Sequence, residues 1–175
     1  ATGTLKFNST YYLMKWKDMQ TAVFDRNLAS IQFNTNIGDA VIQGIETDLT
    51  FLTENGFTII AGAAFTDPEL DDNFILSGVI QATPGTQLAN VSKHKFSIAI
   101  NKEFQTAGGR DGYWDLNLTR TGKRKSSLSN PIDQGAYTLG NLSATLEGEN
   151  WATVIYMDNV FDTRAVIMEY SGYRP

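Results

Sequence analysis

The sequence predicts an all-β protein built as an antiparallel up-and-down meander. Segments that alternate between apolar and polar residues recur along the 175 residues, and a period of two is the pattern of a strand with two different faces. Turns rich in glycine and asparagine separate these segments. Short and long connections also alternate along the chain, which places all short turns at one end of a meander and all long loops at the other.

The stretch from Ile37 to Thr66 shows the pattern most clearly, as a predicted hairpin turning at Thr53–Gly56. In its first half, apolar residues fall at odd-numbered positions: Val41, Ile45, Leu49 and Phe51. Small or polar residues fall at even-numbered positions: Gly44, Glu46, Asp48 and Thr50. Its second half repeats an apolar parity: Phe57, Ile59, Ala61, Ala63 and Phe65. The Asn55-Gly56 pair predicts a type I′ turn. Such a hairpin either covers a soluble core or separates lipid from a wet lumen.

A long strand is predicted before this hairpin, from Thr4 to about Gln20. One parity holds Leu5, Phe7, Tyr11 and Leu13, and the other holds Lys6, Asn8, Thr10 and Tyr12. The strand exceeds the usual ~5–6 residues of soluble sheets. Thr21–Asn36 follows as a turn-rich connection. After the hairpin, Asp67–Val91 is a long polar stretch with two prolines, of a length that is usually functional or disordered.

The second half of the chain repeats the alternation. Strands are expected over four stretches: Lys93–Phe104, Tyr113–Arg120, Ala136–Leu146 and Trp151–Val160. Short turns fall at Gln105–Gly112 and Glu147–Asn150, and a polar loop at Thr121–Gly135. The residues from Phe161 to Pro175 have the composition of a loop.

Composition excludes several classes of protein. A net charge of -5 argues against general nucleic-acid binding. The absence of cysteine excludes disulfides and thiolate zinc sites. No run approaches the ~18 apolar residues of a membrane helix, which does not bear on spanning strands. Ala1–Thr4 lacks the features of a signal peptide, so we expect the chain to begin after processing or partway through a longer protein.

Aromatic residues gather near the ends of the predicted strands. They are Trp16, Phe51, Phe57, Phe65, Phe104, Trp114 and Trp151. Aromatic girdles at the two membrane interfaces would place them there. The general preference of aromatic residues for strands predicts the same distribution.

Three short segments then carry a family resemblance. They are Tyr12–Gln20 (YLMKWKDMQ), Asn36–Ala40 leading to Gly44-Ile45-Glu46, and Met157–Asp162 (MDNVFD). The chain resembles the C-terminal barrel region of TonB-dependent outer-membrane receptors, in which a Trp/Tyr-x-Asp-x-Gln strand, a Gly-x-Glu strand and an Asp-Asn-Leu-Phe-Asp segment follow in this order. Val160 stands where leucine is usual.

The resemblance implies a barrel of about 22 strands with an N-terminal plug, of which this chain supplies about seven. Residues 1–175 are then expected to be a C-terminal portion of the barrel, without the plug and without the final strand, which Gly172–Pro175 would precede. It implies uptake of a scarce nutrient such as an iron–siderophore complex across the bacterial outer membrane. The implied partners are outer-membrane lipid, a small-molecule ligand (siderophore, cobalamin or saccharide) and, through parts absent here, the inner-membrane TonB complex.

Candidate binding residues follow from parity and loop position. Five polar residues on predicted strands are candidates to line a lumen: Glu46, Asp48, Asn101, Asp115 and Asn117. Four residues near predicted external loops are candidates to contact ligand: Phe74, Arg120, Arg124 and Tyr137. The basic group that includes Arg120, Lys123, Arg124 and Lys125 would meet an anionic ligand or lipopolysaccharide phosphates, or be solvated.

No catalytic, metal or cofactor site is predicted. His94 has no serine or cysteine partner pattern, and the acidic stretch Asp67–Asn73 lacks the spacing of a calcium loop. An enzyme, such as a hydrolase, is therefore the last choice. The alternative function is a soluble secreted β-sandwich or β-barrel that binds carbohydrate, with Tyr137 and Phe74 stacking on sugar.

Overall fold

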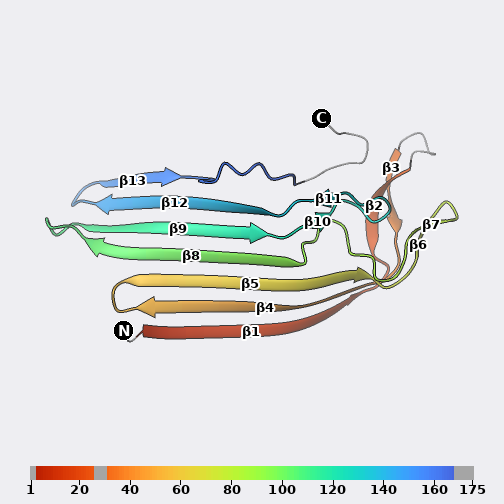
Figure 1. The fold of residues 1–175 in the computed structure, drawn as a ribbon, viewed down its shortest axis with the longest axis horizontal. Coiled ribbons are helices and arrows are strands. Elements are labelled where there is room, and N and C mark those ends of the chain that lie inside the picture. Colours follow the sequence, from red (N-terminus) through yellow and green to blue (C-terminus); the bar gives the residue numbers. More distant parts are fainter. Residues whose placement is uncertain (1–2, 26–30, 168–175) are drawn as a thin grey trace.

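A single antiparallel sheet of seven strands dominates the computed structural model, which describes residues 3–25 and 31–167. The order in the sheet is β1 (Gly3–Trp16), β4 (Ala40–Thr53), β5 (Phe57–Leu70), β8 (His94–Gln105), β9 (Asp111–Thr121), β12 (Tyr137–Glu147) and β13 (Ala152–Met157). Each strand pairs with the next of these along the chain (Figure 1). The described residues contain no helix that is long and apolar enough to cross a membrane. The predicted all-β meander is confirmed.

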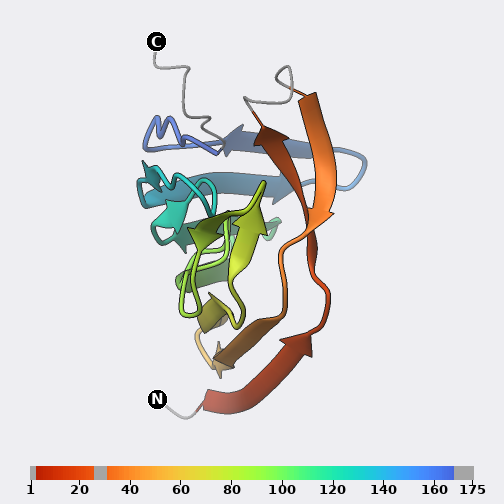
Figure 2. The ribbon, with the colours of Figure 1, turned by 90° about the vertical axis from the view of Figure 1, so that its right-hand side faces the viewer.

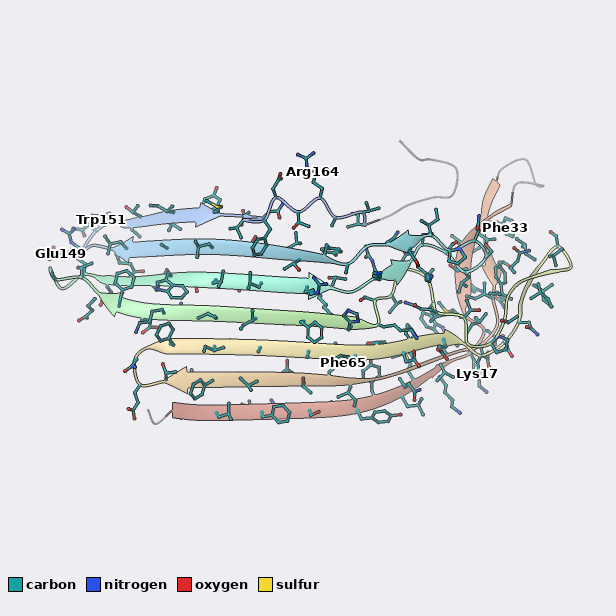
Figure 3. All side chains as sticks on the ribbon, viewed as in Figure 1. Lys17, Phe33, Phe65, Glu149, Trp151 and Arg164 are labelled. Carbon is teal, nitrogen blue, oxygen red and sulfur yellow. The ribbon has the colours of Figure 1, made fainter. Side chains whose placement is uncertain are left out.

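The connections divide between the two ends of the sheet as predicted. Short turns join β4 to β5, β8 to β9 and β12 to β13 at one end, and all three long connections lie at the other (Figure 1). Figure 3 places Glu149 and Trp151 at the short-turn end and Lys17 and Phe33 at the opposite end. We call the second of these the loop end.

The long connections contain strands that the sequence did not predict. Three two-stranded ladders stand at the loop end: β2 (Gln20–Asp25) with β3 (Ile31–Asn36), β6 (Phe74–Leu76) with β7 (Val79–Ala82), and β10 (Arg124–Lys125) with β11 (Asp133–Gln134). Figure 2 shows β2 and β3 standing beside the seven-stranded sheet. The polar and turn-forming residues in these stretches hide their alternation, so interpreting them as loops was wrong.

Several strand limits differ from the prediction. The first strand ends at Trp16 instead of about Gln20, because Asp18 adopts a positive φ of 50°. The chain then leaves the sheet, and Met19 forms two backbone hydrogen bonds with the Ile37–Gly38 segment. The last strand covers only Ala152–Met157, and no strand follows it up to residue 167. Gly172–Pro175 lies outside the described residues.

The turn between β4 and β5 also differs from the prediction. Gly56 has a φ of 75°, but Asn55 does not have a positive φ, which a type I′ turn requires at both central residues. The Gly56 N–H donates to the Thr53 carbonyl at 3.2 Å. The hairpin therefore closes with a three-residue loop in which only the glycine adopts the left-handed conformation.

The register gives the sheet one apolar and one polar face, because residues paired across strands point to the same side. Ile59 pairs with both Phe51 and Ile100, and Ile98 pairs with both Ala61 and Leu118. Glu46 pairs with Ala64, one residue out of phase with Ile59, and so lies on the opposite side. The predicted separation of Ile59 from Glu46 is confirmed.

Buried hydrophobic residues gather at the loop end. We call the buried cluster the loop core; its members are Ile37, Ala40, Leu70, Phe74, Ala82, Leu88 and Leu128. The stretch 67–91, predicted as a polar loop, supplies four of these residues and also extends β5 to Leu70. On the sheet itself, large apolar side chains such as Phe7 (61% exposed) and Ile155 (72% exposed) have no covering layer.

Candidate functional site

The apolar face of the sheet has an aromatic group near each end. At the short-turn end the Phe57 and Trp114 rings meet edge to face, with centroids 6.1 Å apart, and the Lys102 Nζ lies 4.7 Å from the Phe57 centroid. At the loop end Phe65 and Phe96 meet edge to face at 5.4 Å. At about 3.4 Å per residue, β5 runs about 27 Å from Phe57 to Phe65. At a tilt of about 35–45° this length rises about 19–22 Å along the membrane normal, which approaches the height of about 25 Å of the apolar band.

Not every aromatic residue near a strand end belongs to these groups. Trp16 pairs with Ala40 and therefore lies on the polar face, because its parity is opposite to that of Tyr11 and Leu13. Trp151 lies in the turn before β13, where the Arg110 guanidinium stands 5.3 Å from its ring. The expectation that Trp16 belongs to a lipid-side girdle was wrong.

Three of the lumen candidates lie close together on the polar face of β8 and β9. Asn101 Nδ2 donates to Asp115 Oδ1 at 2.9 Å. The hydroxyl of Ser143, on β12, donates to Asp115 Oδ2 at 3.4 Å. Asn117 pairs with Ala99 and Asn141 two positions further along the same face. Asp115 thus links three strands, and Ser143 is a member that sequence reasoning missed although it shares the polar parity of its strand.

The other two lumen candidates belong to a separate polar group on β4. Glu46 lies opposite Thr10, and Asp48 lies opposite Asn8, both on β1. On their other side stand the small residues Ala64 and Gly62 of β5. The structure therefore places the five candidates on one face but in two groups, with β5 between them.

Gly44, from the predicted Gly-x-Glu segment, has a direct structural role on the polar face. The side chain of Tyr12 crosses β4 over Gly44, and its hydroxyl shares a 2.9 Å hydrogen bond with the Thr66 hydroxyl on β5. A Cβ on Gly44 would stand 2.6 Å from that tyrosine oxygen and 2.4 Å from the Phe65 carbonyl oxygen. An aromatic ring covering a glycine in this way pins the register of adjacent strands.

Replacing Gly44 with alanine is expected to destabilise the sheet by about 1–3 kcal/mol, the usual cost of overpacking. The measurement is the shift in urea midpoint of the folded barrel in detergent micelles. Gly108→Ala is the matched control, because a Cβ there meets nothing within 4 Å. Equal stability of the two variants would show that the Tyr12–Gly44 crossing does not constrain the register.

The loop-contact candidates divide into three different environments. Phe74 is only 1% exposed, so its ring stabilises the loop core and is not available to a ligand. Arg124 and Tyr137 lie together, with the guanidinium 5.7 Å from the ring centroid and Nη2 donating to the Val166 carbonyl at 3.1 Å. Arg120 lies on the apolar face, opposite Phe96.

Two ion pairs organise the loop end. Lys93 Nζ stands 2.5 Å from Asp67 Oδ1 and 3.7 Å from Glu69 Oε1, and the hydrogen bond to Asp67 raises the pKa of Lys93. Lys125 Nζ stands 2.5 Å from Asp133 Oδ1, and this hydrogen bond lowers the pKa of Asp133. Both pairs are solvent-accessible, so each contributes little to the free energy of folding.

Asn159, from the predicted MDNVFD segment, anchors the chain after β13. Its N–H donates to Asn141 Oδ1 at 2.9 Å, and its side-chain amide exchanges hydrogen bonds with the Thr163 backbone at 3.0 and 3.1 Å. Its φ of 50° is a conformation that asparagine tolerates better than most residues. The segment therefore lies fixed against β12 without continuing the ladder.

His94 and the acidic stretch show structural contacts. The His94 ring lies 5.8 Å from that of Phe96 on the apolar face. Asp72 Oδ2 accepts the Asp39 N–H at 2.9 Å, and Asp67 and Glu69 face Lys93. Within residues 3–25 and 31–167, no three histidine, cysteine, aspartate or glutamate side chains form a group suited to a metal ion.

Comparison with known proteins agrees with this architecture. A family profile described as "TonB dependent receptor-like, beta-barrel" matches residues 1–160. Among solved structures, the FrpB iron transporter from Neisseria meningitidis (F5-1 variant) superposes with a TM-score of 0.63 at 16% sequence identity, over 91% of this chain and 25% of that one. Comparison with curated protein sequences found no match.

The chain thus spans about a quarter of the length of that transporter. The likeness in structure concerns the fold, and the profile supplies the family over most of the sequence. The predicted resemblance is confirmed: the chain belongs to the TonB-dependent receptor β-barrel family of the bacterial outer membrane.

Proposed function

We propose that these residues form part of the wall and external loops of an outer-membrane receptor that takes up a scarce nutrient, such as an iron–siderophore complex. They would be a C-terminal portion of the barrel, with the plug and the last strand supplied by other parts of the receptor. The protein is then a transporter and not an enzyme, and energy reaches it from the inner-membrane TonB complex through those other parts.

The observation that carries this proposal is the two-faced sheet with all its long loops at one end. A soluble sandwich would cover the apolar face with a second layer, but here large side chains of that face, such as Leu5, Phe7 and Ile155, are exposed. Six of the seven strands have 11 residues or more, enough to cross a bilayer at a tilt of about 45°. This arrangement favours the membrane barrel over the soluble carbohydrate-binding module.

The polar face supports the proposed lumen lining, and cysteine substitution tests it residue by residue. This chain has no cysteine of its own. In the complete receptor, we expect Asp115→Cys and Asn117→Cys to react with a membrane-impermeant thiol reagent. Leu116→Cys and Leu118→Cys, on the opposite face, should resist it because lipid covers them. Equal labelling of all four variants would contradict a lipid-facing apolar surface.

The ligand class is part of the proposal and needs a direct test. FrpB is described as an iron transporter, and this description supports an iron complex as our first choice among siderophore, cobalamin and saccharide. A strain that depends on this receptor should accumulate one labelled compound from that panel, and should lose the uptake when the proton gradient is collapsed. Uptake that persists without the gradient, or uptake of none of the compounds, would contradict the proposal.

Arg124 and Tyr137 are the proposed ligand contacts at the loop end, because the guanidinium and the ring lie together there. For an anionic iron complex, Arg124→Ala is expected to raise the Kd about tenfold, since a charge-assisted hydrogen bond is lost. Binding can be measured with the purified receptor by tryptophan fluorescence. Lys123→Ala, an exposed neighbour, is the control. An unchanged Kd in Arg124→Ala would remove this residue from the proposed site.

A further inference from the structure

We propose that a buried water molecule bridges Gln134 to Arg124, and that Gln134 is thereby a positioning residue for the arginine assigned to the ligand above. The inference rests on the proposed function for the role of Arg124 toward the ligand. The water site and the position of the arginine side chain depend only on how the loop end is packed.

Gln134 is a buried polar residue in the two-residue ladder of β10 and β11. It is 1% exposed, whereas the side chain of Asp133 beside it is 69% exposed. Successive residues of a strand face opposite sides, so Gln134 faces inward and Asp133 faces water. Lys125 pairs with Asp133, and Arg124 pairs with Gln134. The ladder therefore sets Arg124 and Gln134 side by side on its inner face.

Three buried polar atoms of this pair have no hydrogen-bond partner among the residues that the structure describes. They are Arg124 Nε, Gln134 Nε2 and Gln134 Oε1. Burying a donor or an acceptor in this way is unfavourable, and native proteins pair the large majority of such atoms with protein groups or ordered water. An aliphatic side chain at position 134 would avoid this penalty. The glutamine therefore points to a small polar partner that both donates and accepts.

Water has the required chemistry. Arg124 Nε only donates, whereas the amide of Gln134 offers two N–H groups and one accepting oxygen. A single water molecule can accept the N–H of Arg124 Nε and donate to Gln134 Oε1. A nutrient cannot take this place, because the three atoms are shielded from solvent. A bridging water therefore joins the two side chains, as buried waters do for other groups that lack a protein partner.

The ladder is fixed to its surroundings, so Gln134 can orient a neighbouring side chain. Beyond the ladder, the Ser126 N–H donates to the Ile132 carbonyl, and the Ile132 N–H donates to the Ser126 hydroxyl, both at 3.0 Å. On the other side, the Asn90 N–H donates to the Lys125 carbonyl at 2.7 Å. These bonds tie β10 and β11 to each other and to the connection between β7 and β8.

The Arg124 guanidinium is already held on two sides. It lies 5.7 Å from the centroid of the Tyr137 ring, and Nη2 donates to the Val166 carbonyl at 3.1 Å. The water would hold it on a third side, through Nε. Both N–H groups of Nη1 and the second N–H of Nη2 then remain. Within residues 3–25 and 31–167, no carboxylate lies within ion-pair distance of Arg124. The positioned guanidinium therefore keeps donors for an external anion.

Crystal structures of the complete receptor, as wild type and as Gln134→Leu, test the water and the positioning directly. The wild type should show an ordered water within hydrogen-bond distance of Arg124 Nε and the Gln134 amide. In Gln134→Leu the water should be lost and the guanidinium displaced from Tyr137 and Val166. Gln81→Leu is the matched control, because it removes the same amide from β7, in another ladder of the loop end, and should leave Arg124 in place. Gln134→Met replaces Gln134→Leu if the latter does not fold.

A double-mutant cycle separates positioning of Arg124 from a general effect on the loops. The Kd of the purified receptor for iron(III) citrate, an anionic iron complex, is measured for Gln134→Leu, Arg124→Ala and the double variant. We expect Gln134→Leu to raise the Kd about tenfold when Arg124 is present. In the Arg124→Ala background it should have little further effect. A variant that only loosened the loops would raise the Kd by the same factor in both backgrounds.

Four results would overturn the inference. They are a wild-type structure with no ordered water between the two side chains, a direct hydrogen bond between them, an Arg124 side chain that does not move in Gln134→Leu, and equal effects of Gln134→Leu in both backgrounds. If iron(III) citrate does not bind the wild type, the proposed ligand class fails, and the two crystal structures still decide whether Gln134 positions Arg124.

Discussion

Replacing Ile98 with arginine should lower the free energy of unfolding of the complete barrel by about 2–4 kcal/mol. Ile98 lies in the middle of β8 on the apolar face, between Ala61 and Leu118. In a membrane barrel this position falls near the middle of the hydrocarbon, where a guanidinium loses its hydration. The measurement is equilibrium unfolding in guanidinium chloride of the receptor reconstituted in lipid vesicles.

Asn117→Arg is the matched control for this experiment. Asn117 lies on the neighbouring strand β9, at nearly the same level but on the polar face. An arginine there remains hydrated in a lumen, so its cost should be much smaller than that of Ile98→Arg. A cost that is equal at the two positions would mean that both faces meet the same solvent and would contradict the membrane orientation.

The 175-residue chain on its own is expected to aggregate in buffer without detergent. Within the residues that the structure describes, its sheet ends in two unpaired edges, β1 and β13. Its apolar face exposes aliphatic and aromatic side chains such as Leu5, Phe7 and Ile155. Unpaired edges template further strand pairing, and a broad apolar surface drives association.

Size-exclusion chromatography with light scattering checks this expectation, first in buffer and then in detergent above its critical micelle concentration. Detergent should reduce the association, because it covers the apolar face. The loop core is too small to hold the sheet in solution, since its seven buried residues lie at one end of the molecule. A monodisperse monomer in plain buffer with one cooperative unfolding transition would revive the soluble carbohydrate-binding alternative.

Local sequence predicts the main sheet well. A strand that faces an apolar environment on one side and water on the other alternates apolar and polar residues with a period of two. The alternation of Val41, Ile45 and Leu49 with Glu46 and Asp48 predicts β4 and the side to which each residue points, and the register agrees. The positions of the short turns follow in the same way from glycine and asparagine. The family resemblance also follows from local segments, since the register and anchoring roles of Gly44 and Asn159 depend on residue type.

The loop end could not be predicted in the same way, because its order comes from contacts between distant segments. Phe74 belongs to a loop by composition, yet it is buried in the loop core together with Ile37 and Leu128 from other connections. Arg120 and Arg124 look alike in sequence. They are four residues apart and lie in different strands. Arg120 lies on the apolar face, whereas Arg124 lies beside the ring of Tyr137. At this end, the burial of each residue and the direction of its side chain depend on how three connections pack together. The periodicity of any single segment does not predict that packing.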